Sequence, residues 1–147
     1  MAQIVFSIDP GSVHCGTAWW EDGECKWTRE YTPYGLFQLL NNWMTLKSGD
    51  VVVMEEFRLY PWKSAEQGFS QLKTVETIGV VRWIVGTKWS GAVELIEQPA
   101  LIKKPTMGQM RARGVTNLAT EEKTGGHCAD AFLHGWYYLN NPKAKEK

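Results

Sequence analysis

Alternating and continuous apolar stretches divide the chain into short strands and amphipathic helices. Apolar residues at every second position, or in an unbroken β-branched run, indicate strands. Such strands are expected at residues 4–8, 16–20, 25–31, 51–54 and 93–96. Helices are expected where apolar residues recur every three or four positions, at residues 34–44, 64–85 and 127–139. The predicted order of elements is therefore β-β-β-α-β-α-β-α.

This order is typical of an α/β fold with a five-stranded mixed sheet and helices on both faces. The segment 51–54 has no polar residue, so we expect it to lie centrally in the sheet. Residues 98–125 are expected to be rich in loops, and a basic tail from about residue 140 is expected to fray. A chain of 147 residues is expected to form one domain, 1–147.

The helix predicted at residues 64–85 changes character along its length. Its first half is polar, whereas residues 78–85 are apolar nearly all round. A half-helix of this kind must be buried on every side. Its own domain could bury it, or a second subunit could do so in a homodimer.

The charges are distributed unevenly, although the net charge is zero. Residues 1–56 carry three basic and eight acidic side chains, whereas 57–90 and 101–123 each carry five basic and two acidic ones. Basic segments beside an acidic one are expected where phosphates and metal ions meet, although ordinary solvated charge gives the same counts. The side chains expected to contact DNA are Arg58, Tyr60, Lys63, Lys73, Lys103, Lys104, Arg111 and Arg113.

The cysteines and the hydropathy bear on the compartment. Cys15, Cys25 and Cys128 are odd in number and have no CxxC spacing, which argues against a disulfide framework and against a zinc ribbon. No stretch resembles a signal peptide, and no run of about 18 apolar residues could span a membrane. We therefore expect a cytoplasmic protein without membrane contact.

Acidic residues stand at three of the predicted element ends. Asp9 closes the first strand, and Glu55 or Glu56 closes the fourth. Asp130 lies in the first turn of the last helix, and His127, three residues earlier, shares its helix face. The first and fourth strands of such a sheet can be neighbours, so their terminal carboxylates would converge.

Clustered carboxylates repel one another unless a cation neutralises them. Oxygen ligands with a single imidazole favour Mg²⁺ or Mn²⁺ over zinc, and two such ions can hydrolyse a phosphodiester. Taken singly, each residue has an ordinary interpretation: Asp9 as a turn residue, Glu55 as solvent-facing charge, and His127 and Asp130 as helix-start residues. Their combination in this order favours a metal site.

Four segments also resemble, in order, motifs of the RuvC family of Holliday junction resolvases. IVFSIDPGSVHCGTAWW (4–20) is similar to the family's opening strand and hairpin, in which a catalytic Asp precedes Pro-Gly-Ser. VVVMEEF (51–57) resembles its buried strand ending in a catalytic Glu. IEQPALIKKP (96–105) is similar to its fifth strand and Pro-x-x-x-Lys loop, and HCADA (127–131) matches its terminal motif. The resemblance extends from residue 4 to about residue 139.

The resemblance implies an RNase H-like fold and a Mg²⁺-dependent endodeoxyribonuclease. It assigns catalysis and metal binding to Asp9, Glu55, His127 and Asp130, with Glu56 as a neighbour of the catalytic Glu. It further implies two Mg²⁺ ions per active site, for which Mn²⁺ would substitute. A homodimer would nick four-way DNA junctions at two clefts, and the products would carry 5′-phosphate and 3′-hydroxyl ends.

The chain departs from the family pattern at two places. Arg58 occupies the position, three residues after the catalytic Glu, at which the family often has an aromatic wedge. Phe57, Tyr60 or Trp62 could substitute for it. The family's basic region before the last helix is compressed into residues 98–125, which leaves the preference for four-way junctions open.

Three other interpretations remain at this point. An actin-like or sugar-kinase ATPase shares the first strand and Gly-rich hairpin but needs two copies of the domain. A junction-binding scaffold without catalysis would be expected to lack metal ligands. A nuclease for another substrate, such as an RNA–DNA hybrid or a flap, would share the same chemistry.

Overall fold

The computed structural model describes residues 2–57 and 69–145. Its strands are β1 (Ile4–Asp9), β2 (Cys15–Glu21), β3 (Glu24–Tyr31), β4 (Val51–Glu55) and β5 (Glu94–Gln98). Its α-helices are α1 (Pro33–Gln38), α2 (Phe69–Lys88), α3 (Lys103–Ala112), α4 (Leu118–Glu122) and α5 (Gly126–Asn140). Shorter helical turns are η1 (Leu39–Trp43), η3 (Ala100–Ile102) and η4 (Pro142–Lys145).

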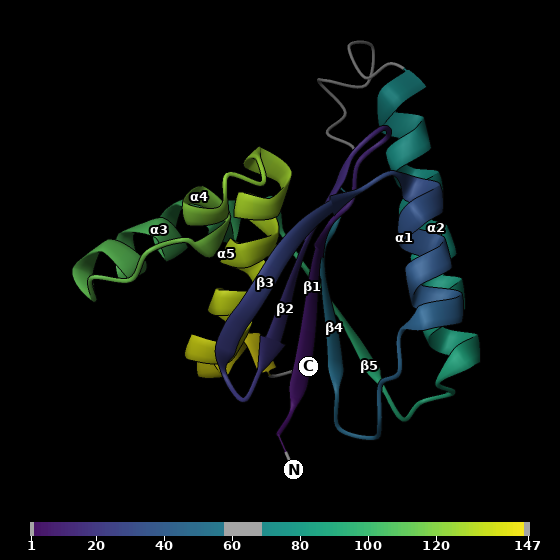
Figure 1. Cartoon of the computed structure of the whole chain (residues 1–147), viewed down its shortest axis with the longest axis horizontal. Coiled ribbons are helices and arrows are strands. Elements are labelled where there is room, and N and C mark those ends of the chain that lie inside the picture. Colours follow the sequence, from purple (N-terminus) through teal and green to yellow (C-terminus); the bar gives the residue numbers. More distant parts are fainter. Residues whose placement is uncertain (1, 58–68, 146–147) are drawn as a thin grey trace.

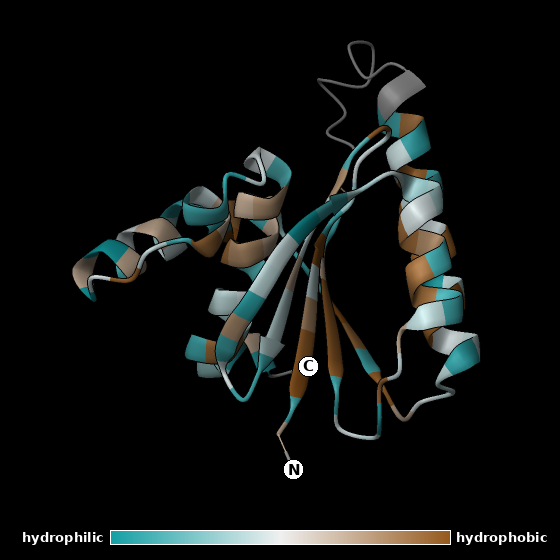
Figure 2. Cartoon of the chain, viewed as in Figure 1, coloured by the Kyte–Doolittle hydropathy of each residue, from teal (hydrophilic) through white to brown (hydrophobic). Residues whose placement is uncertain are grey.

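The five strands form one mixed sheet in the order β3-β2-β1-β4-β5. The pairs β1–β2 and β2–β3 are antiparallel, whereas β1–β4 and β4–β5 are parallel. This confirms the predicted α/β fold and the neighbouring positions of the first and fourth strands. Apolar residues concentrate on the central strands β1 and β4 (Figure 2), which are covered on both faces.

Helices cover both faces of the sheet (Figure 1). On one face of the sheet, the first hydrophobic cluster packs the strands against α1, η1 and α2. On the opposite face, the second cluster packs them against α5 and α3. In β1, β2, β4 and β5, alternate residues pack into the two clusters, as Phe6 and Val5 do in β1. None of the described helices is both long and apolar enough to cross a membrane.

Two expectations about the second half of the chain are wrong. The region 98–125 was expected to be rich in loops, but it contains η3, α3 and α4. Pro105 is the third residue of α3, where the missing backbone N–H has no intrahelical partner to lose. The tail is not frayed as far as residue 145, because η4 folds back and Lys145 Nζ lies 5.6 Å from the centre of the Tyr138 ring.

Two predicted helices also differ from expectation. The helix at 34–44 is split into α1 and the π-helical η1. Residues 64–68 of the helix predicted at 64–85 lie outside the described residues. The described part is buried on one side only, since Trp83 is 67% exposed while Val81 is fully buried. Of the two alternatives, full burial of the second half by its own domain is therefore excluded, and burial by a second subunit stays a prediction.

Two glycines let α5 approach β1 and β2 closely. A Cβ atom on Gly16 would lie 2.0 Å from the backbone carbonyl of His127, at the start of α5. A Cβ atom on Gly135 would lie 2.3 Å from Trp20 Nε1 and 2.7 Å from Ser7 Oγ. These contacts leave no room for a methyl group, so both glycines set how near α5 lies to the sheet.

Replacing Gly16 by Ala should destabilise the protein by at least about 1–3 kcal/mol, because backbone on both sides must shift to admit the methyl group. The free energy of unfolding, measured by urea denaturation, tests this. Gly108→Ala is the matched control: nothing lies within 4 Å of its added Cβ, and it should be neutral or stabilise α3 by up to about 1 kcal/mol. Equal stability of Gly16→Ala and the wild type would contradict the close approach.

Candidate metal centre

The alternation of side chains along β1 and β4 places Asp9 and Glu55 on the same face of the sheet. In β1, Val5 packs in the cluster beneath α5, so Asp9, four residues later, faces the same way. In β4, Val51 and Val53 pack in that cluster, and Glu55 follows at the next position of the same parity. Because β1 and β4 are parallel neighbours, both acids lie side by side at the carboxyl ends of these strands.

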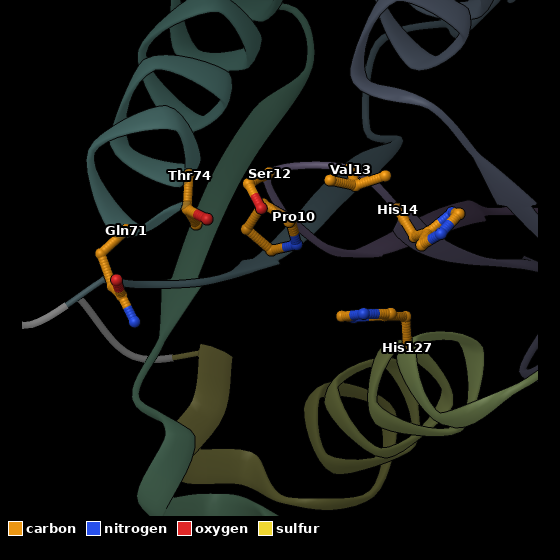
Figure 3. A pocket seen from close by; sticks show the side chains of 8 residues that line it. Pro10, Ser12, Val13, His14, Gln71, Thr74 and His127 are labelled. Carbon is orange, nitrogen blue, oxygen red and sulfur yellow. The ribbon is translucent and has the colours of Figure 1, made fainter. Parts of the chain in front are cut away.

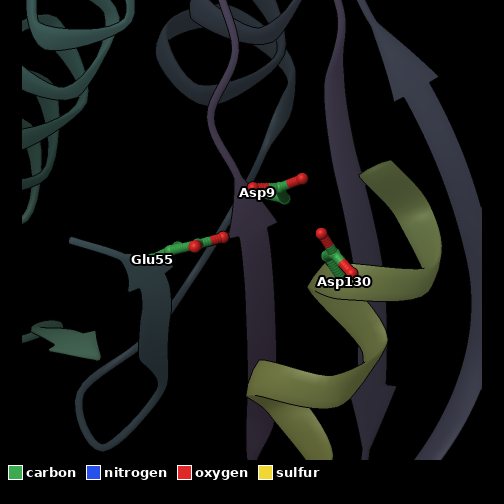
Figure 4. A group of neighbouring side chains, drawn as sticks. All are labelled: Asp9, Glu55 and Asp130. Atoms are coloured by element: carbon green, nitrogen blue, oxygen red, sulfur yellow. The ribbon is translucent and has the colours of Figure 1, made fainter. Parts of the chain in front are cut away.

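Helix α5 contributes the third carboxylate. Single ligand atoms of Asp9, Glu55 and Asp130 all lie within 4.8 Å of one another. Figure 4 shows the three side chains converging from β1, β4 and α5. Among the described residues this is the only group of His, Cys, Asp and Glu side chains that could hold a metal ion in this way. The predicted convergence of the acidic side chains is therefore confirmed, and the cluster could bind metal ions.

A lysine ammonium already lies among these carboxylates. Lys103 Nζ is 3.2 Å from Glu55 Oε1 and 3.1 Å from Asp130 Oδ2. Lys103, which the sequence predicted to contact DNA, thus pairs with two of the three carboxylates. In this structure the ammonium of Lys103 therefore offsets part of the negative charge of a group that could also bind metal ions.

Asp9 and Glu55 have pKa values shifted in opposite directions by their surroundings. Burial, a hydrogen bond with Glu55 and the negative charges of Glu55 and Asp130 raise the pKa of Asp9 to about 9. The pKa of Glu55 is lowered to about 2, against the effect of its burial, by hydrogen bonds with His134 and Asp9 and by the charge of Lys103. Asp9 therefore keeps a proton at neutral pH, which Glu55 accepts in a hydrogen bond.

His127 lies beside the acidic group. Its Nδ1 is 2.9 Å from Asp9 Oδ2, and its side chain is 47% exposed. It lines a cavity of about 260 Å³ that also contains Asp9, Glu55, Lys103 and Asp130. It also lines a neighbouring cavity of about 220 Å³, formed with the β1–β2 turn and with Gln71 and Thr74 of α2 (Figure 3).

The residues expected to contact DNA are spread along the chain. Lys103 and Lys104 open α3 beside the acidic group, and both line an open apolar groove with Asp130. Arg111 lies eight residues further, on the order of 12 Å along α3. Arg113 follows that helix and lies over the Trp136 ring, 5.3 Å from its centre, and Lys73 is exposed on α2.

Arg58, Tyr60 and Lys63 fall outside the described residues, as does Trp62. Phe57, the remaining candidate for an aromatic wedge, lines the cavity of the acidic group and packs partly buried against the first core cluster. Glu56 lines the same cavity.

Sequence reasoning missed two polar residues behind the site, His134 and Gln98. His134 is fully buried, and its Nε2 lies 3.4 Å from Glu55 Oε2. Gln98 ends β5 and pairs with Glu55 in the sheet register. A signal was present, because His134 follows Asp130 by four residues and so shares its helix face.

In EDTA, the free energy of unfolding of the wild type should fall between pH 6 and pH 8. The folded protein then holds the Asp9 proton, which the unfolded chain, with a pKa near 3.8, has lost. Stability therefore falls as pH rises through this window, by up to about 1.4 kcal/mol per pH unit. Urea denaturation of Asp9→Asn should show a flatter profile, whereas Asp22→Asn, in the distant β2–β3 turn, should keep the wild-type slope. Parallel profiles for Asp9→Asn and the wild type would contradict the retained proton.

Comparison with known proteins identifies the fold. No protein-family model and no curated protein matches the sequence. Among solved structures, Thermus thermophilus RuvC in complex with a Holliday junction substrate matches over 92% of this chain and 92% of that chain, with 14% identity and a TM-score of 0.59. Another Thermus thermophilus RuvC structure matches over 92% and 93%, with 15% identity and the same TM-score. The protein therefore has a RuvC-like, RNase H-like fold, with an acidic group that could bind metal ions at its centre.

Proposed function

We propose that the protein is a Mg²⁺-dependent endonuclease that resolves Holliday junctions and related branched DNA. The observation that carries this proposal is the convergence of Asp9, Glu55 and Asp130 at one sheet edge of a RuvC-like fold. One of the matching RuvC structures is a complex with a Holliday junction substrate. Hydrolysis would leave 5′-phosphate and 3′-hydroxyl ends.

The acidic residues would hold the metal, with Mn²⁺ as a substitute for Mg²⁺. Asp9 interacts with both other carboxylates, so it is the natural shared ligand of two ions. When bound, the ions would supply an activated water and positive charge at the leaving oxygen. Asp9 must lose its proton to become a ligand, so metal binding releases a proton from the site.

The side chains around the acids have complementary roles in this proposal. Lys103 would leave Glu55 and Asp130 when cations neutralise them, and its ammonium could then contact a phosphate. His127 borders both cavities and touches Asp9, so it can orient that ligand, bind metal or accept a proton from the attacking water. Lys104, Arg111 and Arg113 would contact the DNA backbone along α3, and Lys73 would do so from α2.

A homodimer fits the exposed side of α2. Leu72, Val75, Gly79 and Trp83 follow one another at intervals of three and four residues, which places them in one row. The three side chains in this row are 58%, 40% and 67% exposed, and space is open around Gly79. An apolar row with a small residue at its centre suits packing against the same helix of a second copy.

Asp9→Asn should abolish cleavage of a labelled four-way junction, to below about one hundredth of the wild-type rate. Changes around metal ligands already cost about 10–100-fold, and a shared ligand should cost more. Junction binding in the variant should be unchanged or tighter, because a carboxylate that repels phosphate is gone. Gel assays on junction, flap, RNA–DNA hybrid and linear duplex, with Mg²⁺ or EDTA, measure this.

Asp22→Asn serves as the control, because the exposed turn with φ of 52° at Asp22 also accommodates Asn. Cutting of all four substrates alike would contradict junction selectivity, and cutting only of the hybrid would make the protein an RNA–DNA hybrid nuclease. Binding without cleavage by the wild type would leave a junction-binding scaffold.

Replacing Lys103 and Lys104 together by Ala should weaken binding to every DNA sequence similarly. It should also flatten the salt dependence by about one unit of log–log slope for each lost phosphate contact. Anisotropy titrations over a range of salt concentrations measure the slope, and Lys26→Ala, at the opposite end of the sheet, is the control. An unchanged slope would mean that neither lysine contacts phosphate.

Trp83→Asp should convert the dimer to a folded monomer, since a charge would be buried in the apolar row. Light scattering reports the mass, and circular dichroism reports the fold. Leu101→Asp is the matched control, because Leu101 is 72% exposed and lies in η3, outside α2. An unaltered dimer in the Trp83→Asp variant would exclude this surface as the interface.

A further inference from the structure

A buried histidine stands directly behind the metal-binding carboxylates. His134 belongs to α5, one helical turn after Asp130, and its side chain is fully buried. Most core positions around it hold apolar residues, such as Ala131 and Phe132. Burial of a polar ring in such surroundings is unfavourable unless both ring nitrogens have partners, so the partners of His134 indicate what it does.

Only one nitrogen of His134 has a conventional partner. Nδ1 lies 2.9 Å from Gln98 Oε1, in hydrogen-bonding range. Nε2 makes no hydrogen bond of regular geometry within the described part of the chain, and Glu55 Oε2 lies 3.4 Å from it. The amide nitrogen of Gln98, which is 3% exposed, also has no hydrogen-bond partner there.

The protons on the ring can be placed from these contacts. A neutral ring with its proton on Nδ1 would point the Nε2 lone pair at a carboxylate oxygen, which is repulsive. Two arrangements avoid this repulsion. Either the ring carries both protons, or the Gln98 amide is rotated by half a turn and donates its N–H to Nδ1. In both arrangements Nε2 carries a proton directed at Glu55 Oε2.

We infer that His134, oriented by Gln98, is a positioning residue that holds Glu55 as a metal ligand by donating a hydrogen bond from Nε2 to Oε2. This inference rests on the metal centre of the proposed function. The two oxygens of Glu55 then have separate tasks. Oε2 is held from behind by His134, while Oε1 faces Lys103 and the acidic group, where a cation would bind.

The other partners of the acidic group are more accessible than His134. The side chain of His127 is 47% exposed and that of Lys103 is 26% exposed, so both can turn towards a substrate. His134 is closed in by α5 and the sheet and cannot do so. It is therefore the permanent donor of the site, and Gln98, from the strand next to β4, fixes its ring.

Binding of Mn²⁺ without DNA tests this inference, with free Mn²⁺ counted by electron paramagnetic resonance. His134→Leu fills a similar volume with an apolar side chain and removes the hydrogen-bond donor, so Mn²⁺ affinity should fall about 10–100-fold. His134→Gln, whose amide N–H can reach towards Glu55, should recover most of this loss. Tyr138→Phe, one turn further along α5, should bind Mn²⁺ like the wild type, which controls for a polar change in the same helix.

Gln98→Leu completes a double-mutant cycle. Alone it should weaken Mn²⁺ binding, and in the His134→Leu background it should add little, because it acts through the ring. If His134→Leu does not fold, His134→Gln and Gln98→Leu still provide the comparison. A merely structural role would lower the urea midpoint of the variants and leave Mn²⁺ affinity unchanged.

The outcomes separate this inference from the proposed function. Wild-type Mn²⁺ affinity in folded His134→Leu, or in Gln98→Leu if His134→Leu fails to fold, overturns the inference and leaves the nuclease proposal standing. Weakened binding in a protein that cuts no branched DNA overturns the nuclease proposal alone. A wild type that binds no Mn²⁺ overturns both.

Discussion

Repulsion among three carboxylates is the constraint on which the centre of this molecule depends. Ligand atoms of Asp9, Glu55 and Asp130 lie within 4.8 Å of one another at the carboxyl ends of β1 and β4, where Asp9 is buried and Glu55 is largely so. Coulomb repulsion at this separation is strong where the surroundings are poorly hydrated. The chain offsets it with the ammonium of Lys103, with a proton kept by Asp9, and with the buried ring of His134. A divalent cation would do the same with greater charge, and that is why this arrangement suits one.

The fold holds the acids together through backbone geometry. Parallel pairing of β1 and β4 sets Asp9 and Glu55 side by side, and strand parity turns both towards α5. The absence of side chains at Gly16 and Gly135 lets α5 lie close enough for Asp130 to join them. Each acid is thus held by an element with a hydrophobic core behind it. The packing of these elements therefore offsets the repulsion, which lowers the free energy of unfolding.

The sequence predicted this arrangement where its signals were local. Strand periodicity, the apolar run at 51–54 and the acids at element ends were sufficient for the sheet, its central strand and the convergence of the carboxylates. The helices at 103–112 and 118–122 were missed, because Pro105 and Gly108 weakened the local signal while burial of Met110 and Ala119 stabilises them. Whether Trp83 is exposed was left open by the sequence, since apolar composition does not reveal which side of a helix a neighbour covers.

The residues behind the site required the tertiary structure. His134 reads in sequence as one more position of a helix, and Gln98 as the end of a strand. Their role depends on the pairing of β4 with β5 and on the packing of α5 over β4, which bring His134 to Gln98, 36 positions away in sequence. Likewise, the sequence predicted Lys103 only as a DNA contact, whereas in the structure α3 places its ammonium between the carboxylates of Glu55 and Asp130.

The long sequence separation between the acids has a consequence for folding. Asp9 ends β1, whereas Asp130 belongs to α5 and meets Asp9 only once that helix has docked on the sheet. A fragment without α5 would keep Asp9, Glu55 and Lys103 but lose Asp130 and the ring of His134. The complete group of three carboxylates therefore exists only in molecules in which α5 is folded against the sheet, and partly unfolded molecules carry no assembled centre.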